Sequence, residues 1–346
     1  MKVNSVLVVG GSGFVGRHLV ASLAAAGIRV TVPSRRRERA KHLILLPTVD
    51  VVEADVMAPG ALERLSAGMQ AVYNLVGILH SRRGGRGERG SNEYGPDFAR
   101  VHVELPQAVV AACRATGVQR LLHVSALGAA PNAPSEYLRS KSIGEHAVLA
   151  AEDLDVTVFR PSVIFGPGDQ FLNQFARLAR FFPAIAVPCP DARFQPVYVG
   201  DVARALHYAL EDPQARGQAY ELCGPRAYTL KQLVETVCAL TGRRRLVLGL
   251  SPRLSYFQAS VLEHLPGKMM TRDNYLSMQV PNTCSAAFPF HLQPQALEAV
   301  APTYLMPSHP RDRCAIHRQI PREAFEADID HAQRTREQRV DRHVRA

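Results

Sequence analysis

The segment from Val6 to Gly27 constrains the fold of this chain more than any other. It begins with an apolar run short enough for a buried strand, continues through a glycine-rich turn and runs directly into a helical pattern that stops at Gly27. Gly10 permits a tight turn, Gly13 lets backbone approach an anion, and Gly16 lets the helix pack closely on the strand. The pattern predicts the strand, turn and helix of a dinucleotide-binding unit.

The start of this helix is the predicted anion site. Backbone N–H groups at a helix N-terminus have no partner within the helix, and they lie at the positive end of its dipole. We therefore expect the pyrophosphate to contact Gly10, Gly13, Phe14, Val15 and Gly16. The alternative interpretation is a glycine-rich surface turn without a ligand.

The residues after the second predicted strand, 28–33, bear on which dinucleotide is bound. An acidic residue about 20 residues past the glycines would accept hydrogen bonds from the ribose 2′-hydroxyl of NAD. Ser34 and Arg35 stand there instead, and a hydroxyl with a guanidinium suits a 2′-phosphate. We therefore favour NADP(H) over NAD(H). A solvated basic helix start is the alternative, and it accounts for Arg37 and Arg39.

Later strands supply further candidate cofactor contacts. Asp55 and Val56 follow a predicted strand at 48–54 and are placed to border the adenine, and Gly77 ends another at 71–76. Further strands are predicted at 120–124 and 154–160. Six strands alternating with helical segments, among them one at 96–117, predict an α/β fold with a Rossmann-type doubly wound parallel sheet.

Tyr137 and Lys141 form the candidate catalytic pair. Pro134 and Ser135 are typical of a helix start, and a spacing of four places both side chains on one helical face. A tyrosine titrates near pH 10, and a neighbouring lysine together with a cationic nicotinamide is expected to lower that pKa. Tyr137 could then pass a proton to or from a substrate oxygen, while Lys141 holds the ribose.

Beyond residue 170 the alternation weakens, and we expect three regions. The first is a dinucleotide-binding domain at 1–170. The second, at 171–306, is a mixed region with a smaller C-terminal subdomain, and some of its segments return to the first domain. The third is a charged, partly helical or flexible tail at 307–346. The helix at 171–182 carries apolar residues on one side and Arg177 and Arg180 on the other. It is either an ordinary packed helix or a face lying on a membrane or a membrane-bound partner.

Composition narrows the class of protein. The chain has 41 Lys and Arg against 31 Asp and Glu, and this balance favours anionic partners without selecting one. The Arg-Gly segment at 81–91 is expected to be a mobile flap, and RNA binding is the alternative. Because no aromatic residues for base stacking accompany the charge, no nucleic-acid partner is expected. The six scattered cysteines predict neither a zinc site nor a disulfide framework. No apolar run is long enough to span a membrane, and no export signal is expected.

Four motifs together resemble the extended or atypical short-chain dehydrogenase/reductase superfamily. They are Gly10-x-x-Gly13-x-x-Gly16, Tyr137-x-x-x-Lys141, Arg160-Pro161-x-x-Ile164-Phe165-Gly166-Pro167 and Val197-Tyr198-Val199-x-Asp201. Longer strings, such as YLRSKSIGEHAV and FRPSVIFGPGDQFLNQFA, are similar to the NAD(P)H-binding accessory subunits of respiratory complex I, the alpha-subcomplex subunit 9 family, in a bacterial form.

This resemblance implies a tightly held NADPH. Gly13 and Gly16 would lie at the pyrophosphate, Arg35 near the 2′-phosphate and Lys141 on the nicotinamide ribose. The nicotinamide would lie near Pro161, Val163 and Ile164. The implied role is support of a quinone-linked respiratory complex, in a cytoplasmic protein peripheral to the inner membrane.

Two departures from active members leave catalysis open. Ser125 is the hydroxyl available to assist the tyrosine, but Ala126 and Leu127 follow it, and His102 replaces a common asparagine. The nucleotide is therefore either structural, or it serves an active oxidoreductase or a sugar-nucleotide epimerase or dehydratase.

Overall fold

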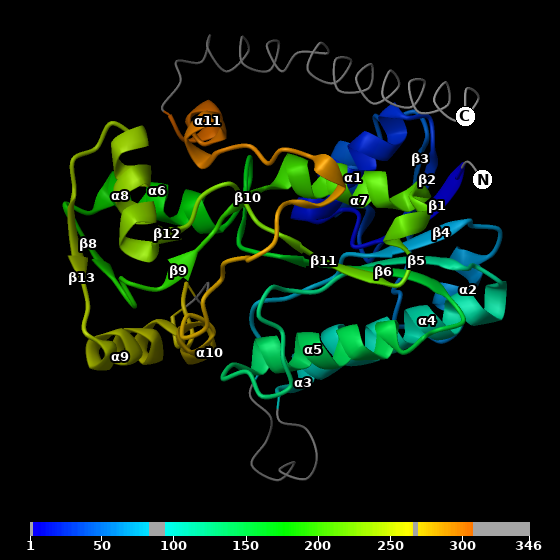
Figure 1. Ribbon diagram of the computed structural model, residues 1–346, viewed down its shortest axis with the longest axis horizontal. Coiled ribbons are helices and arrows are strands. Elements are labelled where there is room, and N and C mark those ends of the chain that lie inside the picture. The colour runs from blue at the N-terminus through cyan, green and yellow to red at the C-terminus, as the bar shows by residue number, and fades with distance from the viewer. Residues whose placement is uncertain (1–2, 83–93, 266–268, 307–346) are drawn as a thin grey trace, which may run out of the picture.

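The centre of the molecule is a parallel sheet. The computed structural model describes residues 3–82, 94–265 and 269–306. Seven strands are arranged in the order β3-β2-β1-β4-β5-β6-β11 (Figure 1). Their bounds are Ser5–Val9 (β1), Arg29–Ser34 (β2), Val49–Glu53 (β3), Ala71–Asn74 (β4), Arg120–Val124 (β5), Asp155–Pro161 (β6) and Gln218–Leu222 (β11). The six predicted strands are confirmed, and β11 extends the sheet beyond β6.

Helices cover both faces of the sheet. Helices α1 and α7 lie on one face, and α2, α4 and α5 lie on the other (Figure 1). Their bounds are Phe14–Ala25 (α1), Ala61–Ser66 (α2), Leu105–Thr116 (α4), Glu136–Leu149 (α5) and Val199–Glu211 (α7). The predicted α/β fold class with a Rossmann-type doubly wound sheet is therefore confirmed.

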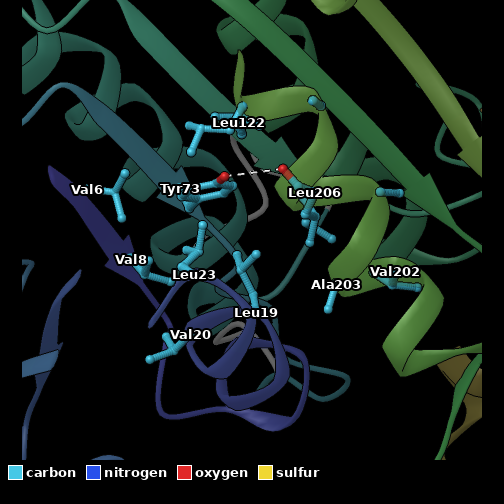
Figure 2. Close-up of a cluster of buried hydrophobic side chains, with 14 of the residues drawn as sticks. Val6, Val8, Leu19, Val20, Leu23, Tyr73, Leu122, Val202, Ala203 and Leu206 are labelled. Atoms are coloured by element: carbon cyan, nitrogen blue, oxygen red, sulfur yellow. Dashed lines mark hydrogen bonds between the residues drawn. The ribbon is translucent and has the colours of Figure 1, made fainter. Parts of the chain in front are cut away.

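The core beneath α1 and α7 fixes both helices on the sheet. Figure 2 shows apolar side chains of both helices converging on β1, where Val6 and Val8 are fully buried. Tyr73 of β4 lies in the same cluster, and its hydroxyl donates a hydrogen bond to the carbonyl oxygen of Leu206 at 3.2 Å. Because each apolar residue is removed from water on this face, the glycine turn between β1 and α1 is held between two packed elements.

A smaller group of elements lies at the end of the molecule away from β1–β3 (Figure 1). Its paired strands are β7 with β10, β8 with β13 and β9 with β12. The strand bounds are Ile164–Phe165 (β7), Ala184–Val187 (β8), Arg193–Phe194 (β9), Val197–Tyr198 (β10), Tyr228–Thr229 (β12) and Leu246–Gly249 (β13). The helix bounds are Phe171–Phe181 (α6), Leu230–Leu240 (α8), Pro252–Leu262 (α9), Arg272–Ser277 (α10), Leu297–Val300 (α11) and Pro302–Leu305 (α12).

The predicted helix at 96–117 has an irregular beginning. Residues Pro96–Phe98 (α3) are followed by a π-helical turn at Ala99–Glu104 before α4 begins, and Gly117 ends α4 with φ 75°. The wider turn at 99–104 holds His102, and such π turns often occur at functional sites.

The prediction that the cysteines form no disulfide framework is wrong for two of them. Cys223 and Cys284 form a disulfide, with their Cα atoms 6.0 Å apart. Cys223 directly follows β11, and the chain returns beside it only after 61 residues, so the spacing in sequence gave no indication of the pair. Cys113, Cys189 and Cys238 are free thiols. The charged tail at 307–346 and most of the Arg-Gly segment lie outside the described residues.

The predicted helix at 171–182 corresponds to α6. Leu172 is fully buried, and Phe171 and Phe175 pack against two apolar clusters, as an ordinary packed helix requires. Phe181 at its end is 73% exposed. Of the helices in the described ranges, none is both long enough and apolar enough to cross a bilayer.

Candidate functional site

The glycine turn has the geometry of a dinucleotide cradle. Gly10 has φ 87°, a conformation that favours glycine. A Cβ atom on Gly16 would lie 2.3 Å from the carbonyl oxygen of Gly10, so the helix can approach the turn only without a side chain. No side chain accepts a hydrogen bond at the N-terminus of α1, which begins with Phe14 and Val15. These N–H groups remain available to an anion, and the residues fit a pyrophosphate.

The loop after β4 brings a third element to this turn. A Cβ on Gly10 would lie 3.2 Å from the carbonyl carbon of Leu75, and a Cβ on Gly77 would lie 3.7 Å from Nζ of Lys141. The sheet order reverses between β1 and β4, and ligands of open α/β sheets bind at such a switch point. The structure therefore gathers Gly10, Gly77 and Lys141 at one place from three parts of the sequence.

Lys141 is buried beneath this loop. Its Nζ donates a hydrogen bond to the carbonyl oxygen of Val124 at 2.8 Å. Burial lowers the pKa of Lys141 to about 8, against an opposing effect of the Glu145 carboxylate. The ammonium is thus a desolvated cation at the predicted nicotinamide ribose, where a polar ligand would solvate it.

Lys141→Met is expected to stabilise the nucleotide-free protein at pH 7. The lowered pKa corresponds to a cost of about 3 kcal/mol for the buried ammonium, and loss of the bond to Val124 offsets about 1 kcal/mol. We expect a net gain of about 2 kcal/mol in the free energy of unfolding. Between the folded pKa of about 8 and the ordinary value of 10.5, the unfolded chain binds more protons at Lys141 than the native protein does. The unchanged protein therefore gains stability as the pH rises through this range. The difference in stability between it and Lys141→Met should then disappear.

Urea denaturation of both proteins from pH 7 to 10.5 measures this gap. Lys231→Met is the matched control, because Lys231 is half exposed and lies 3.9 Å from Glu235. We expect the control to leave stability unchanged within about 0.5 kcal/mol at every pH. If the difference in free energy of unfolding between Lys141→Met and the unchanged protein were constant with pH, Lys141 would not be a buried ammonium with a lowered pKa.

Tyr137 lies at the first turn of α5. Ser135 caps this helix by accepting a hydrogen bond from the N–H of Leu138 at 3.2 Å, as the sequence predicted. The Asp273 carboxylate accepts further bonds from the N–H groups of Glu136 at 2.6 Å and Tyr137 at 3.1 Å. Burial and the Asp273 charge raise the pKa of Tyr137 to about 12. In the protein without a nucleotide the pKa is therefore shifted upward, opposite to the lowering expected from Lys141 with a cationic nicotinamide, because desolvation dominates.

The Ser125 hydroxyl is buried at the end of β5. Its Oγ has no hydrogen-bond partner among the described residues, so it is not bonded to Tyr137. The backbone N–H of Ser125 donates to the carbonyl oxygen of Phe159 at 2.7 Å, which fixes the residue beside β6. A buried hydroxyl without a partner is costly, and a ligand oxygen would satisfy it.

His102 connects the π turn to α5 and to the loop after β4. Its Nε2 accepts a hydrogen bond from the N–H of Ile78 at 3.1 Å, so the network assigns the ring proton to Nδ1, which lies 2.9 Å from Ser140 Oγ. Ser140 in turn donates to the carbonyl oxygen of Tyr137 at 2.8 Å. Burial, with the Lys141 charge, lowers the pKa of His102 to about 2. His102 is therefore a neutral residue that positions both walls of the site.

Asn282 is a site residue that sequence reasoning missed. Its Oδ1 accepts hydrogen bonds from the Ser162 hydroxyl at 2.6 Å and from the N–H of Val163 at 2.9 Å. It thereby holds the predicted nicotinamide wall, which runs from Pro161 to Ile164. No sequence motif surrounds Asn282. The chain comes close to this wall only in the folded protein, where Cys284 forms the disulfide with Cys223.

The predicted 2′-phosphate end of the site is open. Ser34 ends β2, and its hydroxyl donates to the carbonyl oxygen of Arg36 at 2.9 Å, while Arg35 is exposed. After the neighbouring strand β3, Asp55 accepts a hydrogen bond from the N–H of Met57 at 3.1 Å, and Val56 packs against the core. Within the described residues Arg35 forms no ion pair, so its guanidinium can turn toward a ligand at this edge.

These features define an α/β protein with a dinucleotide site at the switch point of a Rossmann-type sheet. The model of the NAD dependent epimerase/dehydratase family matches residues 6–223. The chain belongs to this family, and a nicotinamide dinucleotide is the class of cofactor that this membership supports.

Individual relatives agree with this family assignment. A mouse protein named NADH dehydrogenase [ubiquinone] 1 alpha subcomplex subunit 9, mitochondrial, is 34% identical over 68% of this chain; the match spans 61% of the mouse protein's length. A Caulobacter vibrioides protein named ceramide reductase is 35% identical over 58% of this chain and 59% of its own. The dTDP-glucose 4,6-dehydratase of Streptomyces venezuelae, solved with NAD and TYD bound, superposes with a TM-score of 0.62 at 21% identity, over 72% of this chain and 85% of its own. This last likeness concerns the fold alone.

Proposed function

We propose that this protein holds NADP(H) as a largely structural nucleotide and supports a respiratory or quinone-linked complex from the cytoplasmic side of the inner membrane. The glycine cradle at Gly10, Gly13 and Gly16 would bind the pyrophosphate, and Lys141 the nicotinamide ribose. Pro161, Val163 and Ile164 would border the nicotinamide. The nucleotide would supply a hydride donor or acceptor at this wall. Similarity to the mouse NADH dehydrogenase subunit supports the respiratory association.

The raised pKa of Tyr137 is the observation that most supports a structural role for the nucleotide. A pKa raised to about 12 makes the phenol a poor proton donor near neutral pH, and Ser125 does not hydrogen-bond to it. The Ser140 hydroxyl donates to the backbone carbonyl oxygen of Tyr137, and the His102 ring lies against Ser140 Oγ. These observations support a nucleotide that is held rather than turned over.

Native mass spectrometry of the purified protein tests this proposal. We expect NADP(H) to remain bound and to exchange slowly, without consumption when quinones or sugar nucleotides are added. A protein that carries no nucleotide and shows no thermal shift with NADPH would contradict the proposal.

An active oxidoreductase or a sugar-nucleotide epimerase or dehydratase is the second candidate. Tyr137 and Lys141 are both present, and the buried Ser125 hydroxyl is available to a substrate oxygen. The relative named ceramide reductase makes a lipid carbonyl a reasonable substrate to add to the assay. If the protein turns over its cofactor and Tyr137→Phe abolishes this turnover, the protein is an active enzyme and the structural role is wrong.

Arg35→Gln is expected to weaken NADPH binding by about tenfold and to leave NADH binding unchanged, because a charge-assisted bond to the 2′-phosphate is lost. Isothermal titration with both nucleotides measures this effect. Arg37→Gln is the matched control, since Arg37 is also exposed but begins the short 3₁₀ helix Arg37–Leu43, whereas Arg35 directly follows β2. Tighter binding of NADH than of NADPH to the unchanged protein would overturn the preference for NADP(H).

A further inference from the structure

The end of the molecule opposite β1–β3 presents apolar side chains where a sheet normally presents polar ones. Strands β8 and β13 form a two-stranded ribbon, whose inner residues Ile185 and Val187 are buried against α6 and α8. On β13 the outward residues Leu246 and Leu248 are exposed. These two strands pair in parallel, and parallel strands are normally covered on both faces. This ribbon is apolar on both faces.

Neighbouring elements extend this apolar surface. Phe181 and Phe182 precede β8, and the N–H of Leu246 donates to the carbonyl oxygen of Pro183 at 3.1 Å, so they lie beside β13. Helix α9 packs against β8 through a bond from Gln258 Nε2 to the carbonyl oxygen of Ala186 at 3.2 Å. We call the exposed residues of these elements the end face. They are Phe181, Phe182, Leu246, Leu248, Leu254 and Phe257.

The end face is too open to be an ordinary small-molecule pocket. Its α9 portion borders a groove of about 260 Å³ lined by Leu250, Leu254, Phe257 and Val261 among others. Ligand pockets are usually larger, of about 300–1,000 Å³, and enclose most of their ligand. Phe257 is instead 67% exposed. These side chains project from the protein and are suited to contact an apolar partner.

Arginines border the end face. Arg243 and Arg244 line a groove of about 480 Å³ just before β13. Arg180 lies beside the ring of Phe181, with its guanidinium carbon 5.6 Å from the ring centroid, and Arg253 is exposed at the start of α9. Within the described residues no carboxylate forms an ion pair with any of these four. The charge around the end face is therefore available to an anionic partner.

We propose that the end face inserts into the interfacial region of an anionic lipid bilayer, with these arginines on the lipid phosphates. Exposed aromatic and aliphatic side chains with an arginine border supply the two contributions that peripheral binding needs, apolar insertion and attraction to anionic headgroups. The inference deepens the peripheral association proposed above. It names the bilayer itself as the partner and does not depend on a bound nucleotide.

A tryptophan reporter tests the inference, because the sequence contains no tryptophan. In the full-length chain, Phe257→Trp gives a single tryptophan, on the end face, which can be excited apart from the tyrosines. We expect its emission to shift to the blue with vesicles of phosphatidylcholine and phosphatidylglycerol, and not with phosphatidylcholine alone. Leu45→Trp is the matched control, since Leu45 is 88% exposed but belongs to the opposite part of the molecule, before β3; it should not shift.

Vesicle sedimentation of substituted proteins separates the two contributions. Phe181→Ser with Phe257→Ser should weaken binding by about tenfold or more, and Arg243→Gln with Arg244→Gln should weaken it most at low salt. Arg29→Gln should have no effect. NADPH affinity, measured in parallel, should be unchanged in all variants and serves as the test of folding.

Three outcomes would overturn the inference. Vesicle binding that persists without a shift at Phe257→Trp would mean that another part of the chain binds lipid. A blue shift without lipid that grows with protein concentration would make the end face a contact between copies of this chain. Absence of vesicle binding would exclude the bilayer as partner, whereas loss of nucleotide binding alone would contradict only the proposed nucleotide role.

Discussion

Gly144→Ala is expected to destabilise the protein by about 3 kcal/mol or more. In an open helix this change would stabilise by about 1 kcal/mol, because alanine is the better helix former. Here a Cβ would lie 1.8 Å from the carbonyl oxygen of His102. The π turn cannot easily move away, since the His102 ring is held by the N–H of Ile78 and by Ser140. Steric overlap between two backbones therefore outweighs helix propensity.

Urea denaturation measures this loss, and Ile143→Ala on the same helix is its control. Ile143 is exposed at the edge of α5, so we expect a change within about 1 kcal/mol. A Gly144→Ala protein as stable as the unchanged chain would show that α5 and the π turn can separate at little cost. The described contact would then not be what positions Tyr137.

Gly16→Ala is expected to reduce nucleotide affinity by about a hundredfold or more, since it displaces the turn that carries the pyrophosphate. The added Cβ would lie 2.3 Å from the carbonyl oxygen of Gly10 and 2.6 Å from both Cα and the carbonyl oxygen of Gly11. All three are backbone atoms, so no side-chain rotation relieves the overlap. The helix must move outward, and its free N–H groups move with it.

Gly27→Ala separates lost affinity from lost stability. Gly27 ends the same helix with φ 77°, and a Cβ there meets nothing within 4 Å. We expect this control to cost about 1 kcal/mol of stability, from backbone strain alone, and to leave nucleotide affinity unchanged. Titration of both variants with NADPH gives the comparison. Comparable affinity of the Gly16→Ala protein and the control would place the nucleotide away from this turn.

Local sequence patterns were sufficient for the central sheet. Apolar runs bounded by glycine and polar residues predicted six strands, and the cap residue Ser135 marked a helix start that the structure confirms. They succeeded because hydrophobic periodicity and helix capping are patterns of residues within a few positions of one another. The patterns failed at Cys223 and Cys284, which 61 residues separate.

The sequence by itself determined the glycine turn, the position of Tyr137 and Lys141 on one helix face, and the family that these motifs indicate. Only the tertiary structure decided how these groups behave. Burial raises the pKa of Tyr137 and lowers that of Lys141, and His102 and Asn282 reach the site from distant segments. The physical reason is that a motif specifies which groups are present, whereas desolvation and long-range hydrogen bonds depend on everything packed around them.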